Sequence, residues 1–236
     1  MKISKNHWLN TVFIAHRGLW DSDTPENSII AYQKAIDNGY AIEIDLYETT
    51  DKEIVCFHDK NLKRLTGLDK NVFDLSLSKL KELSIGKGQK IPTLKEVLTL
   101  CENKTPLLIE LKNQPSKTFV NSVINILKDY KGEFAVQSFN PLYIKKIKKL
   151  APEFLRGILA SKVPDTKSKL ERFIVKRMPL NFLAKPDFIS YEHIGLPLKK
   201  NKGLPVISWT IKSQSEYEKA KPFVNNIIFE NFIPKK

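Results

Sequence analysis

The chain has 236 residues, of which 42% are hydrophobic and 28% are charged, and its formal net charge is +13. This balance is typical of a globular protein and excludes a disordered tail, a collagen and a coiled coil. The sequence has no apolar stretch of membrane-spanning length, and the N-terminus lacks the apolar segment of a secretory signal, so neither feature is expected.

Short apolar runs alternate with helical patterns along most of the chain. In the first helical pattern Asn27 is expected as the N-cap and Gly39 as the residue that ends the helix. Further helices are expected over residues 116–130, 141–150, 167–178 and 213–221. Eight main apolar runs are predicted to be strands: residues 12–16, 40–46, 107–112, 134–139, 154–160, 187–191, 205–210 and 226–230.

Strands that alternate with helices form βα units around a parallel sheet. Eight such repeats predict an α/β fold, a TIM (β/α)8 barrel that occupies residues 1–236 as a single domain. The segment over about 59–92 is too long for an ordinary βα loop, so it is expected as a small insertion after the second strand, with a short helix over 76–83. The last strand has no helical pattern behind it, and the N-terminal segment is a candidate to fill that position.

Two cysteines, Cys56 and Cys101, are too few for a disulfide framework and lack the spacing of a zinc site. Both are expected as reduced, packed thiols, which indicates a cytoplasmic protein.

The charge of +13 would attract nucleic acid, an anionic membrane surface or a phosphorylated small molecule. A solvated, lysine-rich surface is the preferred interpretation, because lysine runs such as residues 145–150 fall on expected helix faces. Nucleic acid is therefore not expected as a partner, whereas a phosphate-bearing substrate and a transient membrane-surface contact stay open.

Charged side chains gather where the predicted strands end. Glu43 and Asp45 are two residues apart in the second strand, so they share one face of it. The carboxyl ends of barrel strands form the catalytic face of this fold. Seven residues are expected to meet there: His16, Arg17, Glu43, Asp45, His58, Glu110 and Lys112.

Each of these residues also has a structural interpretation, as a hydrogen-bonding histidine or an ion-paired carboxylate. However, buried carboxylates are costly without cations, and Arg17 and Lys112 supply one positive charge too few for three of them. A divalent cation would restore the balance, and a set of oxygen ligands favours Mg²⁺ or Ca²⁺ over Zn²⁺. Two histidines beside such a cation can serve as general acid and base, and the arginine and lysine can hold an anionic substrate.

Several short motifs follow one another along residues 13–230. They are His16-Arg17-Gly18, Pro25-Glu26-Asn27-Ser28, Glu43-Ile44-Asp45, His58-Asp59, Leu62–Gly67, Glu110-Leu111-Lys112, Gln137-Ser138-Phe139 and Trp209-Thr210. Any one of them occurs by chance, but the ordered set is specific. With these motifs in this order, the chain resembles the glycerophosphodiester phosphodiesterase family.

The resemblance implies a TIM barrel with an insertion after the second strand and a metal bound by Glu43, Asp45 and Glu110. It also implies His16 and His58 as the acid/base pair. The remaining site residues follow: Arg17 and Lys112 near the phosphate, and Trp209 as a candidate contact of the glycerol or alcohol. The chain departs from the family at Phe229-Glu230-Asn231-Phe232, where an Asp in a T-D-x-P sequence is common. That departure affects the expected contacts at the rim of the barrel and the substrate specificity, and it leaves the proposed catalytic residues unchanged.

The expected function is metal-dependent hydrolysis of glycerophosphodiesters to an alcohol and sn-glycerol 3-phosphate. A phospholipase D-like activity on lysophospholipids or sphingomyelin is the enzymatic alternative, and an exposed apolar rim on the insertion would support it. A basic anion-binding module without turnover is the non-enzymatic alternative. The sequence leaves open the preferred alcohol, the native metal and the division of roles between the histidines.

Overall fold

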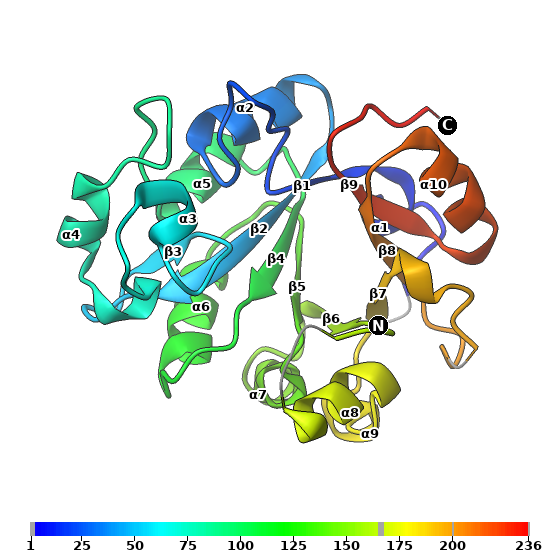
Figure 1. The fold of residues 1–236 in the computed structure, drawn as a ribbon. Helices are drawn as coiled ribbons and strands as arrows, with labels where there is room; N and C mark the ends of the chain where they lie inside the picture. Colours follow the sequence, from blue (N-terminus) through cyan, green and yellow to red (C-terminus); the bar gives the residue numbers. More distant parts are fainter. Residues whose placement is uncertain (1–2, 165–167, 200, 236) are drawn as a thin grey trace. The chain divides into compact units, whose positions relative to one another are not determined.

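The computed structural model describes residues 3–164, 168–199 and 201–235, so the start of the helix expected from residue 167 lies outside the described residues. The chain divides into two compact units (Figure 1). The early unit is Ala15–Phe134, and the late unit combines Met1–Ile14 with Ala135–Lys236.

The early unit is built on strands β1 (Ile14–His16), β2 (Ala41–Glu48) and β4 (Leu107–Leu111). Strand β2 pairs in parallel with β4, and this register places Asp45 opposite Glu110. A short strand, β3 (Ile54–Cys56), runs antiparallel to β2. The helices that follow the strands are α2 (Ile29–Asp37), α5 (Leu94–Cys101) and α6 (Phe119–Leu127). The early unit therefore supplies the βα repeats predicted for the first half of the chain.

Helix α2 begins one residue later than the sequence predicts. Ser28 is its N-cap, since the Ser28 hydroxyl accepts a hydrogen bond from the Ala31 amide. The expectation that Asn27 caps this helix is wrong, because Asn27 adopts a positive φ of 50° and its side chain points to Asp45 instead. Asn27, which was predicted to cap the start of this helix, thus belongs to the site described below.

The insertion after the second strand contains α3 (Lys63–Thr66), a 3-10 turn η1 (Val72–Asp74) and α4 (Leu77–Glu82), and the last of these matches the predicted short helix. It has a small core of its own with residues of β2 and β3. That core consists of Tyr47, Val55, Phe57, Leu62, Val72, Leu80, Ile85 and Ile91. None of the large exposed hydrophobic side chains found among the described residues falls between residues 59 and 92, so the insertion has no exposed apolar rim.

The late unit contains strands β5 (Phe134–Ser138), β6 (Leu155–Ala160), β7 (Phe188–Glu192), β8 (Val206–Ile211) and β9 (Asn226–Phe229). Successive strands from β5 to β9 pair in parallel. The intervening helices are α7 (Pro141–Leu150), α8 (Lys169–Arg177), α9 (Asn181–Ala184) and α10 (Gln214–Ala220), with short 3-10 turns η2 (His193–Gly195) and η3 (Lys221–Phe223).

A short N-terminal helix, α1 (Trp8–Thr11), contacts β9 in the late unit. The Asn226 side chain donates a hydrogen bond to the Val12 carbonyl at 2.6 Å, which ties the last strand to the chain just after α1. The N-terminal segment therefore occupies the place beside the last strand, as the missing helical pattern there predicts.

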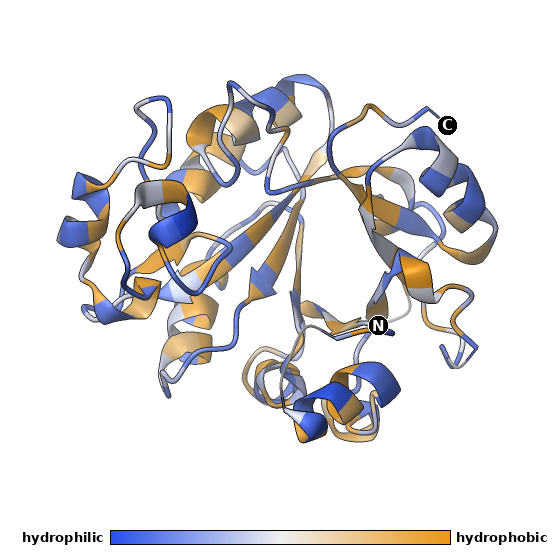
Figure 2. Cartoon of the chain, in the orientation of Figure 1, coloured by the Kyte–Doolittle hydropathy of each residue, from blue (hydrophilic) through white to orange (hydrophobic). Residues whose placement is uncertain are grey.

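The strand–helix repeats of the two units define the fold class as α/β, a TIM (β/α)8 barrel with a small insertion after the second strand. In Figure 2 the strands of both units carry hydrophobic segments, which fits their burial. Within the ranges that the structure describes, no helix is long and apolar enough to cross a membrane.

Candidate active site

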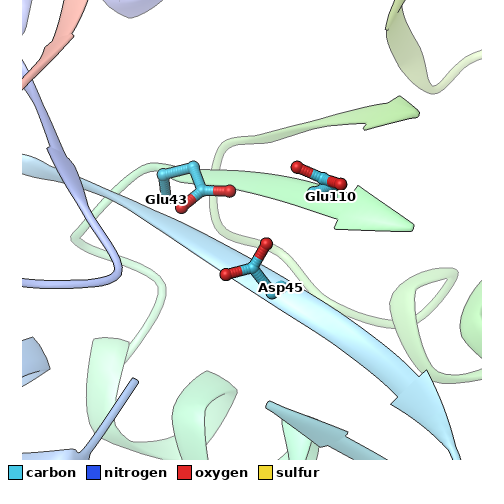
Figure 3. Close-up of side chains that lie close together, drawn as sticks. All are labelled: Glu43, Asp45 and Glu110. Carbon is cyan, nitrogen blue, oxygen red and sulfur yellow. The ribbon is translucent and has the colours of Figure 1, made fainter. Parts of the chain in front are cut away.

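Three buried carboxylates of the early unit point toward one another (Figure 3). Glu43 and Asp45 come from one face of β2, and Glu110 comes from the neighbouring strand β4. One oxygen of each lies within 4.8 Å of the others, and the three residues are 1%, 0% and 7% exposed. The alternation of side chains along a strand and the Asp45–Glu110 register bring these groups together. Their predicted convergence is observed.

Two cations border this cluster. Lys112 follows β4, and its Nζ lies 2.9 Å from a Glu110 oxygen and 3.4 Å from Asp45 Oδ1. Arg17 follows β1; its amide donates to Glu43 at 3.2 Å, and its Nε lies 3.7 Å from Asp45 Oδ2. Both cations are thus placed as their spacing in the sequence predicts.

Burial and neighbouring charges push the carboxyl groups of β2 in opposite directions. Burial, and after it the negative charges of Asp45 and Glu110, raises the pKa of Glu43 well above its ordinary value. Burial also acts to raise the pKa of Asp45, but the positive charge of Lys112 and further contributions from His58 and Arg17 outweigh it and hold that pKa below its ordinary value. A second negative charge beside Asp45 is therefore unfavourable unless more positive charge is present.

The turn that carries Arg17 has an unusual backbone. Arg17 and Asn27 adopt positive φ values of 59° and 50°, and the Asn27 amide donates to the Arg17 carbonyl at 2.9 Å. Between them Gly18, with φ of 82°, packs so close to α2 that a Cβ atom there would lie 2.8 Å from the Ala31 carbonyl carbon. Non-glycine residues in such conformations cost about 1–3 kcal/mol, so the contacts around Arg17 and Asn27 must hold this turn in place.

Asn27 anchors the turn to the cluster. Its Nδ2 donates to Asp45 Oδ2 at 3.0 Å, while its Oδ1 accepts from the buried Tyr32 hydroxyl at 2.8 Å. From the sequence, Asn27 was expected as a helix cap and as part of the Pro25–Ser28 motif, without a role in the site. That motif has no apolar pattern of a helix or strand, and this was the signal in the sequence for a role of Asn27 in the site.

The two histidines end strands or follow them at the same site. His16 is the last residue of β1, and His58 lies two residues after β3. Both act on Asp45, because their charges help to lower its pKa. His58 Nδ1 lies 2.7 Å from an oxygen of its neighbour Asp59. That contact leaves Nε2 as the ring nitrogen available for proton transfer.

A second set of charges joins the insertion to the site, and the sequence did not reveal it. Arg64 of α3 binds Asp59 through Nε at 2.6 Å. Its two terminal nitrogens bind both oxygens of Glu26 at 2.9 and 2.7 Å. Glu26 also accepts from Arg17 at 2.9 Å. Burial acts to raise the pKa of Glu26, but the hydrogen bond from Arg64 and the charge of Arg17 hold it below its ordinary value.

Among the described residues, carboxylates outnumber the permanent cations of the site. The permanent cations are three, Arg17, Arg64 and Lys112, whereas the carboxylates are five: Glu26, Glu43, Asp45, Asp59 and Glu110.

The donor set fits a divalent metal. Asp45 Oδ1 is buried and accepts no hydrogen bond from the described residues, although Lys112 lies 3.4 Å from it. Burial and the charges of Asp45 and Glu110 raise the pKa of Glu43, so an added positive charge nearby would favour its ionised form. Carboxylate oxygens without nitrogen or sulfur partners are the ligands of hard divalent cations. The cluster is therefore a candidate site for a divalent metal ion.

Three other residues considered as candidates, Trp209, His193 and His7, lie in the late unit. Trp209 is in β8, and its ring meets Phe139 edge to face with centroids 5.7 Å apart. The Trp209 Nε1 is buried without a hydrogen-bond partner among the described residues. His193 begins the turn η2, where its Nε2 lies 4.0 Å from Glu216, and His7 caps α1.

An α/β barrel that places carboxylates, cations and histidines together at strand ends has the composition of an active site for an anionic substrate. The model of the glycerophosphoryl diester phosphodiesterase family matches residues 16–234. The chain is 31% identical to a glycerophosphodiester phosphodiesterase of Caldanaerobacter subterraneus subsp. tengcongensis, over 94% of this chain and 95% of that one. It is 26% identical to Lysophospholipase D GDPD1 of Homo sapiens, over 88% of this chain and 79% of that one.

Among solved structures, a phosphodiesterase of Oleispira antarctica in complex with the product sn-glycerol-3-phosphate has a TM-score of 0.78 at 24% identity. The match covers 93% of this chain and 92% of that one. The chain belongs to the glycerophosphoryl diester phosphodiesterase family, and it is a phosphoric diester hydrolase with glycerophosphodiester phosphodiesterase activity. The family resemblance and the barrel fold expected from the sequence are both confirmed.

Proposed function

We propose that this enzyme hydrolyses glycerophosphodiesters to an alcohol and sn-glycerol 3-phosphate, with a divalent cation held by Glu43, Asp45 and Glu110. The observation that carries the proposal is the convergence of these three buried carboxylates within 4.8 Å, beside Lys112 and Arg17. Mg²⁺ or Ca²⁺ suits the oxygen ligands. When bound, such a cation supplies positive charge that polarises the phosphoryl group and compensates its developing negative charge.

The protein's own residues then divide the remaining work. Arg17 and Lys112 bind and orient the phosphate, because both are cations whose side chains border the carboxylate cluster. One of His16 and His58 accepts the proton of the attacking oxygen as its bond to phosphorus forms. The other donates a proton to the alcohol oxygen as its bond to phosphorus breaks, so the alcohol leaves uncharged. The attacker is water or the neighbouring glycerol hydroxyl, and the second route gives a cyclic phosphate before hydrolysis.

Trp209 is our candidate for the contact with the glycerol or alcohol part of the substrate. Its indole N–H is buried without a partner among the described residues, so it can donate to a substrate oxygen. Its ring is held from one side by Phe139. A Trp209→Phe variant keeps the ring contact and removes the donor, and we expect it to raise KM more than it lowers kcat.

The direct test is a substrate panel with glycerophosphocholine, glycerophosphoethanolamine, glycerophosphoglycerol and lysophosphatidylcholine, each assayed with Mg²⁺, with Ca²⁺ and with chelator. The proposal predicts release of sn-glycerol 3-phosphate from at least one of the three glycerophosphodiesters, in the presence of metal only. Full activity after exhaustive chelation would show that the reaction does not depend on a metal ion. Turnover of lysophosphatidylcholine alone would instead favour the second candidate.

A phospholipase D-like activity on lysophospholipids is that second candidate. A human relative carries the name lysophospholipase D. The expected apolar rim is absent from the insertion, but helix α8 exposes Leu170 and Phe173 by 68% and 54%. Lys169, Lys176 and Arg177 lie on or beside the same helix face, and Figure 2 shows hydrophilic and hydrophobic residues side by side there. This face suits a transient contact with an anionic membrane surface.

A matched pair of variants separates the two candidates. Leu170→Ser combined with Phe173→Ser should lower activity on lysophospholipid in anionic vesicles and leave activity on soluble glycerophosphocholine unchanged. Equal activity of variant and parent on vesicles would dismiss the membrane contact. Nucleic acid remains unexpected as a partner.

The insertion over about 59–92 is proposed to shape the alcohol pocket, as part of a single catalytic domain over residues 1–236. Its contact with the site through Arg64 supports this role. Exchanging residues 60–91 for the corresponding segment of a relative should change which alcohols are accepted. Simple deletion is unsuitable, because the insertion packs against Tyr47 of β2 and Phe57 just after β3. Unaltered selectivity in the exchange variant would limit the insertion to a structural role.

A cytoplasmic location is proposed from the cysteines. Cys56 and Cys101 are both free and buried, as expected for reduced, packed thiols. Burial raises the pKa of Cys101 to about 12, so this thiol stays protonated and unreactive at neutral pH.

A further inference from the structure

One arginine of the insertion contacts two carboxylates that border the candidate site. The guanidinium of Arg64 forms a fork with Glu26, at 2.9 and 2.7 Å, and donates through Nε to Asp59 at 2.6 Å. Glu26 is only 6% exposed, whereas the Arg64 side chain is 47% exposed. All three side chains belong to the early unit, and they form one continuous ionic network.

Each carboxylate of this network contacts a residue to which the proposed function gives a direct role. Asp59 lies 2.7 Å from His58 Nδ1, and Glu26 lies 2.9 Å from a terminal nitrogen of Arg17. Arg64 is therefore one side chain away from a proposed acid/base group and one side chain away from a proposed phosphate-binding group. It lies 47 residues from Arg17 in the sequence, and the fold of the insertion brings it there.

The insertion also has contacts that do not involve Arg64. Helix α3 is closed by main-chain hydrogen bonds, from Thr66 to the Leu62 carbonyl and from Gly67 to the Lys63 carbonyl. The side chain of Leu62 is fully buried in the insertion core. The bidentate pair with the buried Glu26 also adds to stability, so a conservative variant is needed to separate folding from positioning. The geometry of this arginine shows which two side chains it holds in place.

We propose that Arg64 is a positioning residue that fixes His58 and Arg17 together, through Asp59 and Glu26. Asp59 accepts from His58 Nδ1 and so holds the ring with Nε2 available for proton transfer. Glu26 restrains the guanidinium of Arg17 where the phosphate is expected. Because one planar group holds both carboxylates, the orientation of the proton-transfer group and that of the phosphate-binding group are fixed relative to each other. The inference rests on the roles proposed above for His58 and Arg17.

The chemistry requires arginine and not simply a positive charge. The Glu26 fork and the Asp59 contact use three nitrogens of one guanidinium. A lysine ammonium is a single point that cannot reproduce this spread of donors. An Arg64→Lys variant therefore keeps the charge and loses the positioning, which separates the two contributions.

The test compares Arg64→Met and Arg64→Lys with Lys63→Met, a control in the same helix whose ammonium binds the distant, exposed Asp69 at 3.2 Å. We expect both Arg64 variants to lower kcat by roughly tenfold to a hundredfold, as for groups that orient a catalytic side chain. Lys63→Met should match the parent. Without the nearby cation, Asp59 favours the protonated ring more strongly, so the limb of the pH–rate profile that belongs to His58 should move to higher pH in Arg64→Met.

Two readouts make the result decisive. In protein labelled at its four histidines, the ring signals of His58 should titrate at higher pH in Arg64→Met than in the parent, whether or not a good substrate is known. In a double-mutant cycle, Arg64→Met should cost much less turnover once Asp59→Asn is present.

Equal turnover and equal His58 titration in Arg64→Met and the parent would overturn the proposal. A parent enzyme without activity on any diester would instead reject the proposed function, and the His58 titration would still decide the role of Arg64. If Arg64→Met does not fold, the same comparison is made with Arg64→Lys.

Discussion

Strand β2 carries buried carboxylates at two places, and they are satisfied in different ways. Glu48, at the end of the strand, is 1% exposed and accepts from the hydroxyls of Ser116, Thr118 and Ser122. Glu43 has a similar exposure, but its hydrogen bond comes from one backbone amide. The same strand thus buries one carboxylate among protein donors and two more, Glu43 and Asp45, in a carboxylate cluster with Glu110.

The pKa values follow this difference. Burial acts to raise the pKa of both glutamates. At Glu48 the hydroxyl hydrogen bonds outweigh burial and hold the pKa below its ordinary value. At Glu43 the negative charges of Asp45 and Glu110 add to burial, and the pKa lies well above its ordinary value. A buried carboxylate is therefore not itself a sign of a metal site; the sign is a buried carboxylate with too few donors.

The largest expected effect is a difference in activity between variants of the carboxylate cluster and variants of Glu48. Asp45→Asn removes a proposed ligand, and the loss of its charge should lower kcat/KM by about a thousandfold or more, since a metal contributes several kcal/mol to such reactions. Glu48→Gln should stay within about threefold of the parent. Initial rates on a glycerophosphodiester with saturating Mg²⁺ measure both. Equal losses in the two variants would break the comparison.

The two histidines lie beside the carboxylate cluster but are not proposed metal ligands, so their removal tests catalysis separately from metal binding. His16→Ala and His58→Ala should each lower kcat by about 10²–10⁴-fold, and their losses should be far from additive. A nitrophenyl phosphodiester, whose leaving group needs no acid, should restore turnover in only one of them and so identify the acid. A histidine whose removal leaves turnover near normal has no part in the mechanism.

Metal addition tests the same difference through stability. At a metal concentration of about 100 Kd, binding to the folded state adds about 2.7 kcal/mol. This should raise the Tm of the parent and of Glu48→Gln by several degrees. Glu43→Gln should show little shift under the same conditions. A full shift in Glu43→Gln would place the cation elsewhere.

The smallest expected effect concerns Glu48 and pH. Its folded-state pKa is below the unfolded value, so its contribution is present above the unfolded pKa and is lost as pH falls through the folded pKa. Glu48→Gln should lower the free energy of unfolding by about 2 kcal/mol at pH 7. Denaturant titrations should show this difference shrinking below the ordinary glutamate pKa. A constant difference between pH 7 and pH 3 would mean that the charge of Glu48 contributes nothing.

Much of the fold follows from local patterns in the sequence. Each of the eight main predicted strands overlaps an observed strand, because buried parallel strands are continuous apolar runs. Helix α7 was predicted at its observed ends, since Asn140 caps it and Pro141 opens it. Helix α5 was not predicted, although Thr93 and Glu96 form a capping box at its start, just after the predicted insertion over about 59–92.

The candidate site was partly predictable for a similar reason. The carboxylates of β2 and β4 stood out as charges inside apolar runs, and strand alternation gave their shared face. The contacts of Asn27 and Arg64 depend on a left-handed turn and on how the insertion folds back, and neither leaves a periodic pattern. Such long-range polar contacts are set by tertiary structure, so motif order indicated the residues but not their partners.

The most direct test of the account is the position of a bound cation in a crystal of the enzyme soaked in Mn²⁺, located by anomalous scattering. The account predicts one strong peak coordinated by oxygens of Glu43, Asp45 and Glu110, and the same peak in Glu48→Gln. Loss of the peak in Asp45→Asn would complete the agreement. Absence of a peak at these three carboxylates in the parent enzyme, or a peak at Glu48 instead, would contradict it.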